Sequence, residues 1–463
     1  MKRILVVGTM ASRPFILANV LKACEDLELD LVLVDRPEHR PHSVAAVAES
    51  NFIPGQIDDH SPENMREIVQ RVAEFARGRT IDAVMTFINP YAELAGHLAD
   101  RLGAAGNSAA AVRTAHVKAL ARERLASVPE ITVPFRVVRS TEAARKAFWA
   151  MGGGSFVMKP IVGAGSTFVR TGIDSEEAAA RSFEDIDQGV RGYAGRAGAG
   201  WDTLDLYPGI MMERQLHGPE IDVELVVRRG ASGRTEAAFS HVVDNPPMDG
   251  PYAVEKGLTS PSRLPRGIQA AAIEGAVEAA RVLGLTVGNL HVEEIITPEG
   301  PKVVEVNARM GGGRSMLVIR EVTAVNLVEA GMRALLGMPV PPARERPDFI
   351  LERRFINPKV SGRIEYVRGL EDAARIVGKD RVHLYKAVGD RILAAPDHFH
   401  DRIGAAEAVG SSYDAAFDRL LDAMKRVQVG IKTERGELVE HTGDDSHWKV
   451  DPLEILEEAR RRS

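Results

Sequence analysis

The sequence predicts a mixed protein of α/β and α+β class, arranged as three domains. The chain has 463 residues, a length typical of about three domains. Its first hundred residues alternate apolar strands with helices, which is typical of a parallel sheet. Strands and glycine-rich turns dominate after Phe135 until a helix at about Gly267–Leu283. The proline-rich segment Pro339–Pro342 then precedes a smaller α+β unit.

The N-terminal unit, residues 1–112, is predicted to be a parallel α/β domain. Apolar strands separated by helices indicate a parallel sheet that is covered on both faces. The expected strands and helices are Ile4–Val7, Pro14–Ala23, Leu29–Val34, Met65–Ala76 and Ile81–Phe87. Val7-Gly8-Thr9 ends the first strand, but no G-x-G-x-x-G pattern follows it, so the sequence does not indicate an NAD(P)-dependent dehydrogenase.

The remaining chain is expected to form two domains. A central domain covers residues 113–343, with two subdomains of about 113–208 and 209–343, and a C-terminal α+β domain covers 344–463. A helix over Ala109–Leu125 is predicted to end before Pro129 and Pro134. Asp187–Thr203 lacks periodicity and is predicted to be a mobile loop. The C-terminal domain is expected to contain strands near Phe349–Ile356, Gly362–Val367 and Arg381–Tyr385, and a helix at Tyr413–Val427.

Composition and charge exclude several classes of protein. The net charge of −6 is spread over 65 acidic and 59 basic residues, so no nucleic-acid-binding surface or polybasic membrane patch is expected. The N-terminus lacks the shape of a signal peptide, and no apolar run reaches the length of a membrane span. Cys24, the single cysteine, lies on an apolar helix face and is expected to be a core residue. These features predict a cytoplasmic protein.

The strongest chemical signal is a predicted hairpin of two strands. His291-Val292-Glu293-Glu294-Ile295 and Val303-Val304-Glu305-Val306-Asn307 are joined by a turn at Thr297–Gly300. Residues two apart on a strand share a face, so Glu305, Asn307 and Arg309 point together and Glu293 can join them from the opposite strand. Two carboxylates and an amide oxygen suit Mg²⁺, and the arginine can neutralise a transferring phosphoryl group.

Two further segments have features of a nucleotide site. Phe156–Pro160 carries Lys159 near the end of a predicted strand, and the small-residue loop Gly163–Thr167 follows it. A lysine and free backbone N–H groups are suited to polyphosphate. The segment Gly209–Glu220 is an apolar strand that runs into polar residues. Each segment is a weak signal when it stands alone.

The order of these segments resembles the ATP-grasp superfamily. A lysine strand with a glycine loop is followed about fifty residues later by an M-E-x-x-L strand, and then by an E-x₁₁-E-x-N-x-R hairpin. The match covers about 109–340, and the N-terminal α/β domain is in keeping with it. The resemblance implies an ATP-grasp fold with a pre-ATP-grasp N-terminal domain and a small C-terminal domain, with ATP and Mg²⁺ as cofactors and Mn²⁺ as a substitute metal.

The resemblance also implies a role for each matching residue. The implied phosphate contacts are Lys118, Lys159, Gly165 and Ser166, and the adenine linker runs from Glu213 through Arg214 to Leu216. Glu220 is the acid implied to bind the ribose hydroxyls, and the implied metal ligands are Glu293, Glu305 and Asn307. The implied catalytic groups are Arg309, the Gly311 backbone and His291. His291 stands where some ligases have an arginine, so a core histidine is the alternative.

Within the superfamily, the chain most resembles the L-amino acid ligases, the group that contains alanine–anticapsin ligase. The segment His241–Pro261 resembles their substrate loop, and Val360–Ile364 resembles part of their terminal domain. The resemblance implies that Glu255 meets a substrate ammonium group and that Gly312 and Gly313 line a substrate pocket. The implied reaction joins a carboxylate to an amine through an acyl phosphate. The partners are small molecules, and a homodimer is one candidate assembly.

Four alternatives remain beside this interpretation. A carboxylate–amine ligase of the purine pathway would differ only in its acceptor pocket. A biotin-dependent carboxylase would need a hairpin around Lys425, where helical spacing is found. A non-catalytic nucleotide sensor could lose the metal cluster, which is complete here. Finally, Asp397–Asp401 could bind a metal, but it is predicted to be a solvated turn.

Overall fold

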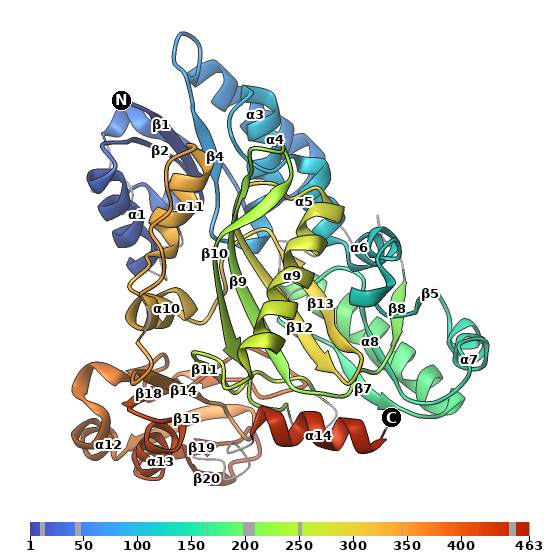
Figure 1. Cartoon of the computed structure of the whole chain (residues 1–463). Coiled ribbons are helices and arrows are strands. Elements are labelled where there is room, and N and C mark those ends of the chain that lie inside the picture. Colours follow the sequence, from blue (N-terminus) through green and yellow to red (C-terminus); the bar gives the residue numbers. More distant parts are fainter. Residues whose placement is uncertain are drawn as a thin grey trace.

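The computed structural model describes residues 1–9, 14–41, 48–163, 165–197, 209–248, 252–344, 346–443 and 451–462. It contains an N-terminal α/β unit, a central antiparallel sheet, a smaller lateral unit and a C-terminal unit (Figure 1). None of the described helices is long and apolar enough to cross a membrane.

The N-terminal unit is a parallel four-stranded sheet, as predicted. Its strands have the order β3-β2-β1-β4, and every pairing is parallel. The strand β1 is almost wholly buried, because helices cover the sheet. The elements are β1 (Arg3–Val7), α1 (Pro14–Asp26), β2 (Asp30–Asp35), β3 (Phe52–Pro54), α3 (Pro62–Phe75), β4 (Ala83–Met85) and α4 (Ala92–Leu102).

The helix predicted over 109–125 is two helices in the structure, α5 (Ala109–His116) and α6 (Lys118–Leu125). The chain breaks at Val117, whose ψ of 101° is extended. The Lys118 N–H then donates to the Ile161 carbonyl instead of continuing the helix. The break fixes Lys118 beside the glycine loop, which is a tertiary contact that helix propensity does not report.

The lateral unit is a four-stranded sheet, β5-β8-β6-β7, with two helices packed on it. Its helix α8 contradicts the predicted loop over 187–203, since it continues to Ala197; residues 198–203 lie outside the described part. Ala179, Ile186 and Val190 are buried on one face of α8 and hold it in place. The elements are β5 (Phe135–Val138), α7 (Thr141–Ala150), β6 (Phe156–Pro160), β7 (Arg170–Ile173), α8 (Glu176–Ala197) and β8 (Ile210–Arg214).

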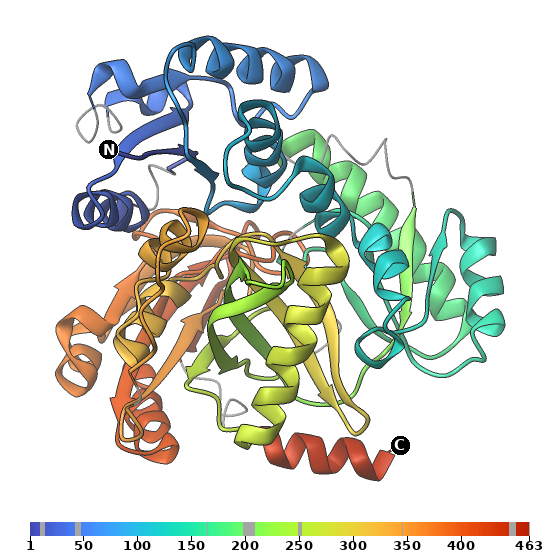
Figure 2. The same ribbon diagram turned by 45° about the horizontal axis from the view of Figure 1, so that its top comes forward.

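The central sheet has eight antiparallel strands in the order β13-β12-β9-β10-β11-β14-β18-β16. Helix α9 packs on one face of it, and α10 and α11 lie between the sheet and the N-terminal unit (Figures 1 and 2). The sheet continues across the boundary predicted near 343. The elements are β9 (Glu220–Arg229), β10 (Thr235–Asp244), β11 (Gly257–Ser260), α9 (Arg266–Leu283), β12 (Gly288–Thr297), β13 (Gly300–Asn307), α10 (Ser315–Thr323), α11 (Leu327–Leu335), β14 (Ile350–Ile356), β16 (Val382–Leu384) and β18 (Gly404–Gly410).

The C-terminal unit adds a second, smaller antiparallel sheet of order β17-β15-β19-β20. Helix α13 confirms the helical pattern around Lys425 and leaves no hairpin there for a biotinylation site. The last helix, α14, returns to the central core through Leu456 (Figure 2). The elements are β15 (Gly362–Arg368), α12 (Leu370–Val377), β17 (Arg391–Ile392), α13 (Tyr413–Met424), β19 (Gln428–Lys432), β20 (Leu438–Thr442) and α14 (Pro452–Arg462).

Candidate active site

The predicted hairpin of β12 and β13 is present and brings the acidic residues together. Glu293 pairs directly with Glu305, and His291 pairs with Asn307. The neighbouring strand β9 extends both rows, with Asp222 opposite Glu293 and Glu224 opposite His291. Side chains that lie opposite one another on adjacent strands share a face of the sheet. One face of β13, β12 and β9 therefore carries two rows of polar side chains, Glu305–Glu293–Asp222 and Asn307–His291–Glu224.

Lys118 joins this acidic face to the glycine loop. Its Nζ donates to the Gly163 carbonyl at 2.8 Å and lies 3.2 Å from Glu305 Oε2. Burial would raise the pKa of Glu305, but Lys118 and Lys159 hold it below its ordinary value. Glu305 is therefore ionised. The two predicted phosphate-binding lysines and a predicted metal ligand thus converge from three separate segments of the chain.

Lys159 is held by a buried ion pair with Glu213. The Lys159 Nζ lies 2.5 Å from Glu213 Oε2, and both residues are at most 5% exposed. Arg122 also contacts Glu213, and it donates to the carbonyls of Val303 and Val304 on β13 at 2.7 and 3.1 Å. The Glu213 carboxylate is therefore the ionic junction between the lateral sheet, α6 and the acidic hairpin.

The chemistry of the donor set fits Mg²⁺ in the presence of polyphosphate. Glu293 and Glu305 are adjacent carboxylates, and Asn307 is 3% exposed with its side-chain Nδ2 buried and unpartnered. Among the described residues, no group of three His, Cys, Asp or Glu side chains could hold a metal ion by itself. Mg²⁺ takes few protein ligands and fills its coordination shell with phosphate and water oxygens.

His291 is an integral part of the acidic face. Its Nδ1 lies 2.8 Å from Glu224 Oε1, and its Nε2 lies 3.5 Å from Glu293 Oε1. Burial would lower the pKa of His291, but Asp222 and Glu224 raise it well above its ordinary value, so the ring is protonated. This cation offsets part of the negative charge, as an arginine at the same position would.

Glu224 connects His291 to the turn after β13. The Gly311 N–H donates to both carboxylate oxygens of Glu224 at 3.0 Å. A role for this N–H as an oxyanion donor would therefore require it to leave Glu224. Arg309 is half-buried, and its guanidinium donates to the Met310 carbonyl at 2.8 Å. Arg309 thus lies at the start of this turn, two residues after the predicted metal ligand Asn307.

In the predicted adenine strand, the Arg214 side chain contacts other parts of the lateral unit. Arg214 donates to the carbonyls of Gly153 and Met151 and stacks over Phe156, so its side chain points away from the acidic face. Leu216 is half-buried in the link between β8 and β9. Glu220 begins β9, where burial and then Glu293 raise its pKa well above the ordinary value. A raised pKa fits a carboxyl group that donates to or accepts from neutral hydroxyls.

Residues 397–401 lie in a turn with Asp397 and His400 exposed, as predicted, but the segment also reaches the glycine loop. Phe399 is buried and contacts Phe168 and Tyr252 with centroid distances of 5.5 and 6.1 Å. A Cβ atom on Gly165 would lie 1.6 Å from His400 Nε2, so a larger residue there would displace the His400 ring. Gly165 and Ser166 both have positive φ, at 63° and 56°. This backbone turn is therefore enclosed by 397–401.

Glu255 lies at the end of the same segment. Its carboxylate is 2.5 Å from Arg402 and about half-exposed. Burial would raise the pKa of Glu255, but Arg402 and His400 lower it to about 2, so it is ionised. Gly312 has open space around it, whereas Gly313 has a φ of 59° and faces Phe355. Glu255, Gly312 and Gly313 are thus near the turn that carries Arg309.

Arg122, Asp222, Glu224, His400 and Arg402 are site residues that sequence reasoning missed. The two acids could have been found from the sequence, because Glu220, Asp222 and Glu224 alternate along one strand and therefore share a face of the sheet. Arg122 lies one helical turn after Lys118. His400 and Arg402 gave no local signal, since their contacts depend on the placement of the C-terminal unit.

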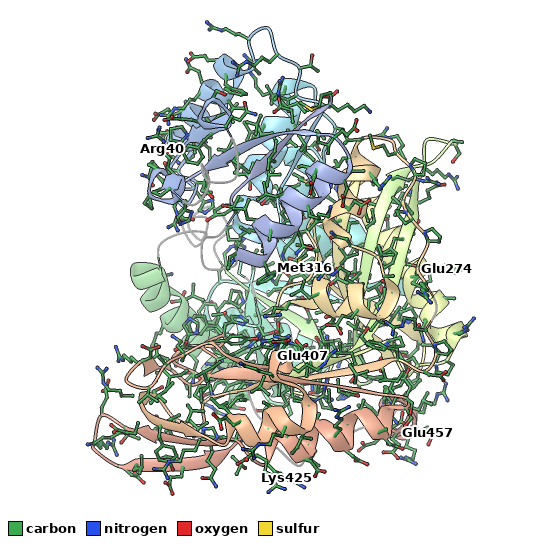
Figure 3. All side chains as sticks on the ribbon, turned by 90° about the vertical axis from the view of Figure 1, so that its left-hand side faces the viewer. Arg40, Glu274, Met316, Glu407, Lys425 and Glu457 are labelled. Carbon is green, nitrogen blue, oxygen red and sulfur yellow. The ribbon has the colours of Figure 1, made fainter. Side chains whose placement is uncertain are left out.

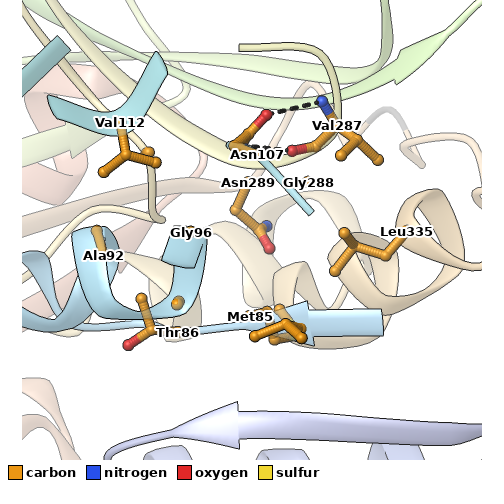
Figure 4. A pocket seen from close by; sticks show the side chains of 13 residues that line it. Met85, Thr86, Ala92, Gly96, Asn107, Val112, Val287, Gly288, Asn289 and Leu335 are labelled. Atoms are coloured by element: carbon orange, nitrogen blue, oxygen red, sulfur yellow. Dashed lines mark hydrogen bonds between the residues drawn. The ribbon is translucent and has the colours of Figure 1, made fainter. Parts of the chain in front are cut away.

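A small cavity lies at the boundary between the N-terminal unit and the central sheet. It has a volume of about 40 Å³ and lies between the N-terminal unit and the ends of β12 and α11, next to Met85, Asn289 and Leu335 (Figure 4). Asn107 closes one side by bonding to the backbone of Thr286 and Val287 (Figure 4). This volume suits one or two water molecules and excludes a nucleotide.

Comparison with known proteins shows which fold the chain has. The structure matches the L-amino acid ligase from Bacillus licheniformis with a TM-score of 0.69 and 20% identity, over 92% of this chain and 98% of that one. It also matches carboxyaminoimidazole ribonucleotide synthase from Aspergillus clavatus complexed with ATP, with a TM-score of 0.63 and 16% identity, over 91% and 97% of the two chains. The chain therefore has the predicted ATP-grasp fold.

Sequence comparison narrows this class. Residues 354–432 match the L-amino acid ligase C-terminal domain 2. The chain is 31% identical over 357 residues to carnosine synthase 1 of Gallus gallus, which covers 75% of this chain and 36% of that protein. The chain thus spans about a third of the length of this relative. The predicted resemblance to ATP-grasp carboxylate–amine ligases of the L-amino acid ligase type is confirmed.

Proposed function

We propose that this protein is an ATP-dependent ligase that couples the carboxylate of one amino acid to the amine of another. The observation that supports this most is the convergence of Lys118, Lys159 and Glu305 on one face, beside Asn307 and Arg309. Two cations next to a hard-oxygen ligand set suit a magnesium–nucleotide complex. The resemblance to L-amino acid ligases and to a carnosine synthase favours amino-acid substrates over a ribonucleotide amine.

The reaction would proceed in two steps. A carboxylate oxygen of the acid substrate attacks the γ-phosphorus of ATP, the bond to the β-phosphate oxygen breaks, and ADP leaves. The nitrogen of the amine substrate, as the free base, then attacks the acyl carbon; phosphate leaves and the nitrogen gives up a proton. Bound Mg²⁺ would neutralise phosphate charge during the transfer. Arg309 would stabilise the negative charge that develops on the phosphoryl and carbonyl oxygens.

The test of this function is a screen of pairs of L-amino acids with ATP and Mg²⁺, repeated with each amino acid alone. We expect ADP and inorganic phosphate to accumulate with an accepted pair, and a condensed product one water lighter than the pair by mass spectrometry. An acyl phosphate would make phosphate the leaving group. Formation of AMP and pyrophosphate would contradict the proposal, because it would indicate an adenylating enzyme.

A second prediction concerns the proposed pocket at Gly312. We expect Gly312→Trp to restrict ligation to small substrates while ADP formation with those substrates is retained, because an added side chain finds open space there. Gly313 is a poorer site for the same substitution, since its φ of 59° and the 3.3 Å approach to Phe355 would add strain.

The matched control is Gly267→Trp, an exposed glycine in the first turn of α9 that also has open space around it. This variant is expected to keep the full substrate range. The measurement is the relative rate of phosphate release across amino acids of increasing size. An unchanged range in Gly312→Trp would place the pocket elsewhere.

A further inference from the structure

Arg314 is a cation without a countercharge at the end of the catalytic turn. It precedes α10, and its φ of 71° is in the left-handed region, so a non-glycine residue is held there in a strained conformation. Its guanidinium lies 5.6 Å from the ring of Phe15. Among the described residues, Arg314 forms no hydrogen bond or ion pair that would neutralise it, and its Nε is buried and unpartnered.

The carboxylates around Arg314 already have cations of their own. Glu407 is contacted by the fully buried Arg353, and Arg381 lies 3.7 Å from it. Arg381 also pairs with Glu321 at 2.8 Å. Figure 3 shows Glu407, on β18, below Met316 of α10. Arg402 is paired with Glu255. The region therefore holds four arginines and three carboxylates, namely Arg314, Arg353, Arg381 and Arg402 with Glu255, Glu321 and Glu407. One positive charge is left over, and it is at Arg314.

The start of α10 offers further unused donors. Ser315 is 4% exposed, and its Oγ has no hydrogen-bond partner in the described structure. No side chain caps this helix. The N-terminus of a helix carries positive potential, which favours an anion. The Arg314 guanidinium and the Ser315 hydroxyl are thus carried by consecutive residues at the start of α10, and Ser315 Oγ lies beside Gly311 in the turn that carries Arg309.

This point adjoins the proposed reaction centre. Arg314 follows Arg309 by five residues in the same turn. A Cβ atom on Gly313 would lie 3.9 Å from Arg402 Nη1, so the turn faces the arginine that holds Glu255. The acid substrate loses its carboxylate to phosphorylation beside Arg309 and the metal ligands. A second anion subsite one turn away is therefore suited to a different carboxylate.

We propose that Arg314 and Ser315, at the N-terminus of α10, bind the free carboxylate of the amine-bearing substrate. This inference rests on the proposed function and deepens it, because it names the residues that would hold the carboxylate of the amine substrate. Arginine binds carboxylates through two parallel N–H···O bonds, which gives direction as well as charge. Glu255, on the other side of Arg402, would then be near the opposite end of the same zwitterion.

The test compares an accepted amino acid with its C-terminal amide as the amine substrate. We expect the wild-type protein to prefer the amino acid. We expect Arg314→Gln to raise the KM for the amino acid about 10- to 100-fold, which corresponds to loss of one or two charged hydrogen bonds. The KM for the amide and the KM for ATP should stay near the wild-type values. Arg314→Lys should recover part of the loss, because it retains the charge.

Arg320→Gln is the matched control. Arg320 lies on the same helix, is exposed, and donates to Asn19 Oδ1 at 2.9 Å, so its replacement should leave both KM values unchanged. An equal rise for amino acid and amide in Arg314→Gln, or a rise in the KM for ATP, would overturn the inference. So would a wild-type preference for the amide.

Binding without turnover separates this inference from the proposed function. If no amino-acid pair is ligated, the proposed function fails, and the shift in unfolding temperature caused by each L-amino acid and its amide is measured instead. A shift with an amino acid but not with its amide, lost in Arg314→Gln, would still support the subsite. Absence of any such difference would overturn it.

Discussion

Replacing Glu305 with glutamine is expected to reduce ligation by at least about 100-fold while the fold is retained. The substitution removes one of two carboxylates, Glu293 and Glu305, that pair across the hairpin on the face that also carries Asn307. Changes in groups that merely support a metal ligand already cost about 10- to 100-fold in affinity or activity, so loss of a ligand charge should cost more. Lys118 would also lose its ionic partner, although it keeps its bond to the Gly163 carbonyl.

The measurement is ADP release over a series of Mg²⁺ concentrations from micromolar to tens of millimolar. If Glu305 is a metal ligand, part of the loss should be recovered at high Mg²⁺, because weaker binding can be offset by concentration. Glu299→Gln is the matched control, since Glu299 is an exposed acid in the turn of the same hairpin. Full activity of Glu305→Gln at low Mg²⁺ would rule out a role in metal binding.

Residues that share a strand or a hairpin could be predicted from the sequence. Glu293 and Glu305 were expected on one face because side chains alternate with a period of two and the turn between the strands is short. The helix at Tyr413 was likewise predicted by its apolar spacing. In each case, the pattern that predicts the structure lies within one helix or one hairpin, because the side-chain periodicity of that element alone decides which residues share a face.

Contacts between distant segments could not be predicted in this way. Arg122 reaches Glu213 across 91 positions of the sequence, and Arg402 reaches Glu255 across 147. Neither pairing has a local pattern, because each depends on how whole units pack. The helix α8 was missed for a related reason: its glycines argue against a helix, but burial of Ile186 and Val190 against the lateral sheet outweighs propensity.

The largest effect on stability is expected from Glu213→Gln. Glu213 is the only carboxylate that the described structure places against both Lys159 and Arg122, which are 5% and 3% exposed. The amide would leave two buried cations without a countercharge. Breaking a buried ion pair by removal of one partner costs about 3–5 kcal/mol, because the remaining charge stays desolvated. The fold should weaken first where β8, α6 and β13 meet.

The effect of this substitution should depend on pH in a defined direction. Burial alone would raise the pKa of Glu213, but Arg122 and Lys159 lower it from 4.5 to about 2. Because the folded-state pKa is lowered, the carboxylate stabilises the fold fully above about pH 4.5, and this contribution is lost as the pH falls towards 2. The difference in unfolding temperature between wild type and Glu213→Gln should therefore be constant near neutrality and shrink in acid.

Two further variants locate the cause of this instability. Glu236→Gln breaks an exposed pair with Arg228, whose atoms are 2.8 Å apart, and should cost at most about 1 kcal/mol. Lys159→Met in the Glu213→Gln background removes one of the two stranded cations and should restore part of the lost stability. Hydrogen exchange of 118–125 and 210–214 would show whether the loss is local. A Glu213→Gln protein as stable as wild type at neutral pH would mean that Arg122 and Lys159 find other partners, and that Glu213 is not the ionic junction of the site.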